Sequence, residues 1–212
     1  VGDDFQINPE QIELRYFGVL TKIFNVGRFA SQFEFDGDLD TIPEDLENED
    51  KWILAEFSDL LEKAKTGYSE LDIYTAAQGI KTFSTGVFAS HWLEMAKTRL
   101  YNDDASATWT LHRIFRDLLS ILSPVCPFFT HHLSTTLYEK SSVEIDVFPE
   151  SPISDTKSWT DITESLIDFN SVVWKAKKDA GVSLAAPISG HNVPDSLKDI
   201  ENALVSMHKL ED

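Results

Sequence analysis

The chain of 212 residues is poor in cysteine and in long apolar runs. Cys126 is its single cysteine, which excludes an internal disulfide framework and a metal cluster held by several cysteines. No apolar run reaches the length of about 18 residues that a membrane span needs, and no basic segment is followed by the apolar stretch of a signal peptide. These absences predict a cytoplasmic location and no membrane partner. The first residue is Val1 rather than methionine, so we expect a processed start or a piece of a longer chain.

Basic residues are also scarce, since 18 Lys and Arg stand against 36 Asp and Glu, for a net charge of −18. Such a charge argues at first against a nucleic-acid partner, but its distribution matters more than its sum. Residues 34–62 hold 12 acidic residues and one basic residue, whereas residues 63–140 hold seven acidic and eight basic residues. The acidity is therefore concentrated in one segment and in the C-terminal part, and the other helices could hold a local positive face.

Apolar residues make up 42% of the chain and recur mostly at helical spacing, which is enough for a packed core. The pattern predicts helices over residues 8–33, 48–66, 70–101, 106–122, 127–139, 159–179 and 195–208. Alternation of apolar and polar residues with a period of two predicts a strand over Val143–Phe148, and the segment Val182–Ile188 is strand-like. Short connections between the helices indicate a mainly α fold: an antiparallel helix bundle over residues 1–150, with a small α/β extension over residues 151–212.

Motifs for catalysis and for nucleotide binding are missing. The chain has no Gly-x-Gly-x-x-Gly, no Walker loop and no Gly-x-Ser-x-Gly, so we predict no catalytic residue and no cofactor in this chain. His131 and His132 are adjacent and would face different directions on a helix. His91 has Glu94 one turn on but no third ligand at helical spacing. We interpret all three histidines as surface or packing residues.

The acidic loop after the first helix resembles a calcium-binding loop in part. The positions of EF-hand ligands would fall on Asp36, Asp38, Asp40 and Glu47. Thr41 stands where the sharp turn of an EF-hand requires glycine. We therefore interpret the segment as a solvated acidic loop and predict no metal site.

Two polar stretches remain as candidate binding residues: Lys22, Asn25, Arg28 and Phe29 in the first helix, and Lys97 and Arg99 near the end of the third. Periodicity alone favours a solvated face for the first stretch. For the second it favours stabilisation of the helix end by its cations, with Glu94 paired to Lys97.

These stretches resemble motifs of a known family. K-I-F-N-V-G-R-F (22–29) resembles the first-helix signature of the anticodon-binding domain of class I aminoacyl-tRNA synthetases, and D-K-W-I-L (50–54) resembles the opening of its next helix. W-L-E-M-A-K-T-R-L-Y (92–101) resembles its third helix, and P-V-C-P-F-F-T (124–130) resembles the turn into its fifth. The four motifs occur in the family's order over roughly residues 12–150. K-A-K-K-D-A-G-V-S-L (175–184) resembles the segment that follows the bundle.

Within this class the Arg-Phe pair at 28–29 and the form of residues 92–101 resemble the valyl enzymes most. Isoleucyl enzymes usually carry an acidic residue where Thr98 stands. His131 and His132 replace a usual Glu pair, and Glu144 and Phe148 replace a usual His and Trp. The same domain of an isoleucyl- or leucyl-tRNA synthetase, and a helical protein-interaction module with no RNA role, are the alternatives.

The resemblance implies a domain that binds the anticodon stem-loop of a tRNA. Its parent enzyme would join valine to tRNA with ATP and Mg²⁺, and the catalytic and editing domains of that chain would be its partners. Catalysis would then lie outside these 212 residues.

The resemblance also implies roles for the candidate residues. Arg28 would hydrogen-bond an anticodon base, and Phe29 would stack on a base or pack beneath one. Lys22 and Asn25 would be supporting contacts one or two turns earlier. The expected phosphate contacts are Lys97, Arg99, Lys175, Lys177 and Lys178. The acidic loop would face away from the RNA.

Overall fold

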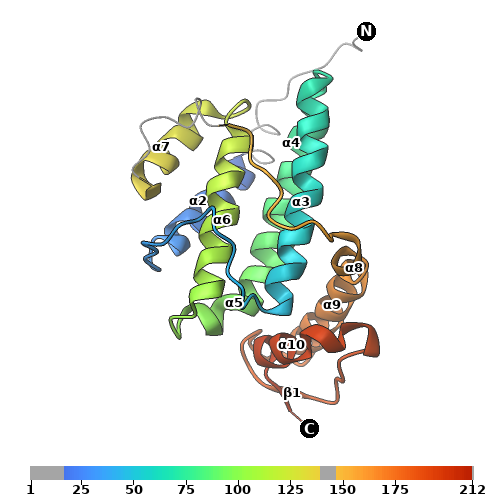
Figure 1. Ribbon diagram of the computed structural model, residues 1–212. Coiled ribbons are helices and arrows are strands. Elements are labelled where there is room, and N and C mark those ends of the chain that lie inside the picture. Colours follow the sequence, from blue (N-terminus) through green and yellow to red (C-terminus); the bar gives the residue numbers. More distant parts are fainter. Residues whose placement is uncertain (1–16, 139–146, 212) are drawn as a thin grey trace.

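The computed structural model describes residues 17–138 and 147–211 (Figure 1), and over these residues the fold is mainly α-helical. The helical body consists of α2 (Gly18–Ala30), α3 (Asn48–Ser69), α4 (Ile73–Thr82), the π-helix η2 (Phe83–Trp92), α5 (Leu93–Leu100), α6 (Ala105–Leu122) and α7 (Pro127–Tyr138). The C-terminal extension holds α8 (Lys157–Thr160), α9 (Thr163–Asp179), β1 (Ile188–Ser189), the 3-10 helix η3 (Asp195–Ile200), α10 (Glu201–His208) and β2 (Leu210–Glu211). The two short strands pair in parallel, Ile188 with Leu210 and Ser189 with Glu211.

The helices predicted from periodicity are confirmed in their main parts. α3 begins at the predicted Asn48, and α6 and α7 follow the predicted ranges closely. Asp72 and Asp104 begin α4 and α6 as N-caps, because their carboxylates accept hydrogen bonds from the Thr75 and Ala107 amides at 3.1 and 2.9 Å. The predicted start at Asn8 and most of the predicted strand Val143–Phe148 lie outside the described residues.

Three predictions about the course of a helix or strand were wrong. The helix predicted over residues 70–101 is π-helical in its middle third, because the hydrogen-bonding register changes there without a sequence signal such as proline. The helix predicted over residues 159–179 is divided between Thr160 and Thr163, where Thr163 Oγ1 accepts a hydrogen bond from Trp52 Nε1 at 2.8 Å. Of the segment Val182–Ile188, only Ile188 is a strand residue, since a turn forms in which the Ala186 amide donates to the Ser183 carbonyl at 2.9 Å.

One apolar core runs through the helical body and into the C-terminal extension. Its largest fully buried side chains include Trp52, Trp92, Trp109, Phe57, Phe88 and Phe115. The same cluster contains Leu166, Val173, Leu197 and Leu204 of the extension. In Figure 1, α8, α9 and α10 lie together at one end of the helical body, beside α5. The domain division at residue 150 stays a prediction.

A buried polar chain joins the extension to η2. Asn170 Nδ2 donates to His91 Nδ1 at 2.9 Å, and His208 Nε2 lies 2.7 Å from Asn170 Oδ1. Because an amide oxygen only accepts, His208 carries its proton on Nε2, and its buried Nδ1 has no partner among the described atoms. Burial lowers the pKa of His208 to about 4 and also lowers the pKa of His91. Both rings are therefore neutral, and His91 is a packing residue as predicted.

None of the helices in the described part of the chain has the length and apolarity needed to cross a membrane.

Candidate nucleic-acid interface

Exposed polar side chains line the outer face of α2. On α2 these are Thr21, Asn25 and Arg28, and Gln32 continues the same spacing of three or four residues in the turn after the helix; all four are exposed. The opposite face buries Ile23, Val26, Gly27 and Ala30. Among the residues that the structure describes, none forms a hydrogen bond or ion pair with the side chain of Asn25 or Arg28. An amide and a guanidinium are therefore free to meet a ligand from solvent.

Gly27 allows the buried face of α2 to lie close to α6. A Cβ atom at this position would lie 3.0 Å from Cζ of Phe115 on α6. The glycine of the K-I-F-N-V-G-R-F stretch is thus a packing requirement, which fixes the distance of α2 from the core and so the position of Arg28.

Lys22 points toward η2 rather than into solvent. Its Nζ donates to the Thr85 carbonyl at 2.5 Å and to Ser90 Oγ at 2.9 Å. Burial lowers the pKa of Lys22. The ammonium therefore joins α2 to η2, and the RNA contact predicted for Lys22 stays a prediction. The geometry favours a role in positioning α2.

Phe29 belongs to a cluster of three aromatic rings with Phe33 and Tyr101. The ring centroids of Phe29 and Phe33 are 4.9 Å apart, and Tyr101 lies 5.4 Å from Phe33 and 6.1 Å from Phe29. All three contacts are edge-to-face, the arrangement that aromatic quadrupoles favour. Phe29 is half-buried in this cluster, which connects the C-terminal ends of α2 and α5.

Lys97 and Arg99 have different surroundings although both lie in the last turn of α5. The Lys97 side chain is 39% exposed and its Nζ lies 2.5 Å from Glu94 Oε1, the pair expected from the sequence. The Arg99 side chain is 17% exposed and contacts Glu49, Asp50 and Asp104 at 3.0, 2.7 and 3.0 Å. Lys97 can reach a phosphate by exchanging one exposed partner, whereas Arg99 already has three carboxylates.

The carboxylates around Arg99 are costly to bury without it. Asp50 is fully buried and also accepts a hydrogen bond from Trp92 Nε1 at 3.1 Å. Burial raises the pKa of Asp50 and of Glu49, and the Arg99 guanidinium opposes that rise. Burial also opposes the charge of Arg99, but hydrogen bonds to Asp50 and Asp104 raise its pKa. The phosphate contact predicted for Arg99 stays a prediction. The contacts of the Arg99 side chain favour a structural role, in which its charge joins α3, α5 and α6.

The prediction that Lys177 contacts a phosphate is wrong. Its side chain is fully buried, and Nζ donates to the carbonyls of Leu184 at 2.8 Å and His208 at 2.7 Å. Lys177 follows Val173 by four residues on the buried stripe of α9, a position that the sequence alone could have identified. Lys175 and Lys178 are exposed, and their phosphate contacts stay predictions.

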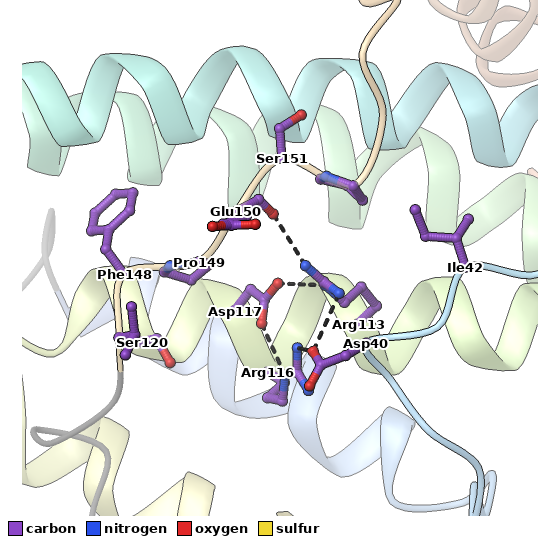
Figure 2. Close-up of a pocket in the computed structure, with 12 residues that line it drawn as sticks. Asp40, Ile42, Arg113, Arg116, Asp117, Ser120, Phe148, Pro149, Glu150 and Ser151 are labelled. Atoms are coloured by element: carbon purple, nitrogen blue, oxygen red, sulfur yellow. Dashed lines mark hydrogen bonds and ion pairs between the residues drawn. The ribbon is translucent and has the colours of Figure 1, made fainter.

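The acidic loop is attached to α6, a feature that the sequence analysis missed. Arg116 Nη2 lies 2.7 Å from Asp40 Oδ1. Arg113 donates to the carbonyls of Leu39 at 3.0 Å and Glu150 at 3.1 Å. Figure 2 shows both guanidinium groups also facing Asp117. The Asp117 carboxylate oxygens lie 2.6 Å from Arg113 Nε and 2.9 Å from Arg116 Nε.

The pocket beside these arginines is also lined by Ser120, Phe148 and Pro149 (Figure 2). Since both arginines there are already paired, the residues described at this pocket offer no unpaired cation to an anionic ligand. No group of three or more His, Cys, Asp or Glu residues in the described ranges could hold a metal ion. The outer face of α2 is therefore the stronger candidate for binding RNA.

Comparison with known proteins gives a family match over residues 50–191, to the model described as "Anticodon-binding domain of tRNA ligase". The valine–tRNA ligase of Saccharolobus solfataricus is 31% identical over 89% of this chain and 22% of its own length. The valine–tRNA ligases of Nanoarchaeum equitans and Aeropyrum pernix are 28% and 30% identical, over 100% and 99% of this chain and 27% and 26% of their own lengths. The chain thus spans about a quarter of the length of these relatives, and the match to the N. equitans protein includes α2, which precedes the family match.

Proposed function

The chain belongs to the family of anticodon-binding domains of tRNA ligases, and from this premise we propose that it binds a tRNA anticodon stem-loop through the outer face of α2. The main observation in support is that the side chains of Asn25 and Arg28 are exposed and have no partner among the described residues. Anticodon bases are single-stranded, so their edges are open to polar side chains.

Arg28 is the central contact of this proposal. A guanidinium has five N–H donors and no acceptor, which suits base edges and phosphate oxygens. Asn25 lies one turn earlier on the same face and adds an amide that can both donate and accept. Phe29 supports this face from within the aromatic cluster, and Lys97 adds a half-exposed cation from α5.

Lys22 and Arg99 act on this interface through their positions in the fold. Lys22 holds α2 against η2, and Arg99 holds the end of α5 against α3. The acidic loop, attached to α6 by Arg113 and Arg116, would lie away from the bound RNA. The short connections between α3 and α4 and between α5 and α6 support the antiparallel bundle proposed for α2–α7.

The names of the relatives support valine as the amino acid of the parent protein. That protein would attach valine to tRNA in the cytoplasm, with ATP and Mg²⁺ bound by a catalytic domain outside this chain. The catalytic and editing domains would be its partners within the parent protein.

The proposal is tested by binding a fluorescent RNA hairpin that carries a valine anticodon. Arg28→Ala should weaken binding about 10- to 100-fold, because it removes hydrogen bonds from a charged donor. Lys65→Ala is a matched control, since it removes one exposed cation from α3 and should change the affinity less than about threefold. Equal losses in the two variants would mean that only overall charge matters, and the α2 interface would be rejected.

A further inference from the structure

Tyr101 is an exposed aromatic residue at the edge of the proposed interface. It is 61% exposed, follows α5 directly and has its amide bound to the Lys97 carbonyl at 3.0 Å. Its backbone is therefore fixed by the last turn of α5, while much of its side chain faces solvent.

The inner side of Tyr101 is fixed by two other rings. Phe29 and Phe33 contact it at centroid distances of 6.1 and 5.4 Å, with interplanar angles of 89° and 64°. Both of these rings are less exposed than Tyr101. The cluster thus holds the Tyr101 ring in place without covering its outer side.

Two cations lie on the helices that meet at this ring. Lys97 precedes Tyr101 by one turn, and its half-exposed side chain shares that face of α5. On α2, Arg28 is next to Phe29, which contacts Tyr101. Near the end of α5, Glu49, Asp50 and Asp104 are paired with Arg99, and Asp103 is exposed. Lys97 and Arg28 therefore place one half-exposed or exposed cation on each of the two helices that hold the ring.

We propose that Tyr101 is the platform on which one base of the bound RNA loop stacks, with Phe29 and Phe33 as its supports. This inference rests on the proposed function and replaces Phe29 as the stacking residue, because Phe29 lies beneath the exposed ring. A base stacked on a protein aromatic is a recurrent mode of single-strand recognition, and it leaves the base edge open to Arg28 and Asn25.

The test uses hairpins that carry the valine anticodon and the fluorescent base 2-aminopurine at one loop position at a time. The wild-type chain should quench the fluorophore at the position that stacks. Tyr101→Phe should keep this quenching and bind within about threefold of wild type. Tyr101→Leu should lose the quenching and bind about 5- to 100-fold more weakly, because the stack is removed.

Tyr74→Leu is the matched control, since Tyr74 is 71% exposed on α4 and should behave as wild type. Tyr101→Gln supplies a second non-aromatic variant, and thermal melting shows that each variant is folded. Quenching and affinity that survive in both non-aromatic variants would overturn the stacking role while leaving the proposed function intact. A wild-type chain that binds no hairpin would overturn the proposed function and this inference together.

Discussion

Replacing Arg99 separates a structural role from an RNA contact. Arg99→Met keeps the apolar stem of the side chain and removes the charge that faces Asp50 and Glu49. Asp50 is fully buried, and the Glu49 side chain is 8% exposed. Removing one partner from a buried ion pair leaves an uncompensated charge, which costs about 3–5 kcal/mol of unfolding free energy.

The matched control is Lys97→Met, two residues earlier on the same helix. The Lys97 pair with Glu94 is well exposed on both sides, so its loss should cost less than about 0.5 kcal/mol. Urea unfolding followed by circular dichroism gives both free energies. The difference between the two variants, taken from their unfolding midpoints at a common slope, avoids most of the error of extrapolation to zero denaturant.

The pH dependence gives a second readout of the same network. Burial raises the pKa of Asp50 and Glu49 in the folded state, and loss of Arg99 would raise it further. When the pKa of a carboxyl group is higher in the folded than in the unfolded protein, the free energy of unfolding falls as the pH rises above the unfolded pKa. Arg99→Met should therefore be destabilised more at pH 7 than at pH 5. If Arg99→Met keeps wild-type stability at pH 7 but loses hairpin binding, Arg99 is a phosphate contact and the structural assignment is refuted.

Two further variants test packing and protonation. Gly27→Ala should cost about 1–3 kcal/mol of unfolding free energy, because its Cβ would lie 3.0 Å from Phe115, whereas Gly86→Ala meets open space and should be nearly neutral in the same urea assay. Burial lowers the pKa of His208 in the folded protein to about 4. The contribution of the neutral His208 ring to the free energy of unfolding is therefore fully present above about pH 6.5 and is lost as the pH falls toward 4. His208→Gln should flatten that part of the stability profile, and an unchanged slope between pH 4 and 6.5 would contradict the assignment.

Periodicity predicted the helices well because burial follows it closely. Ile53, Phe57, Leu60, Leu61 and Ala64 share one side of α3 in the sequence, and all are buried. The π-helical register of η2 has no comparable pattern, because its apolar and polar residues are not separated onto two sides at the α-helical spacing.

The candidate site was less predictable, because the partner of a polar side chain is set by residues distant in sequence. Lys22 and Arg28 belong to the same helix, yet Lys22 donates to Thr85 while Arg28 remains exposed. Arg99 meets Glu49 and Asp50 from another helix. Local spacing identified which stretches carry polar side chains, but only the packing of helices separates the free cations from the paired ones.

The most direct test of the central claim compares two hairpins that share a stem and differ only in the order of the three anticodon bases. Both are titrated into the wild-type chain at about 0.1 M salt, where nonspecific phosphate contacts are partly screened. If α2 reads anticodon bases, the valine anticodon should bind at least about tenfold more tightly than the permuted triplet. Equal affinity for the two hairpins would contradict the account.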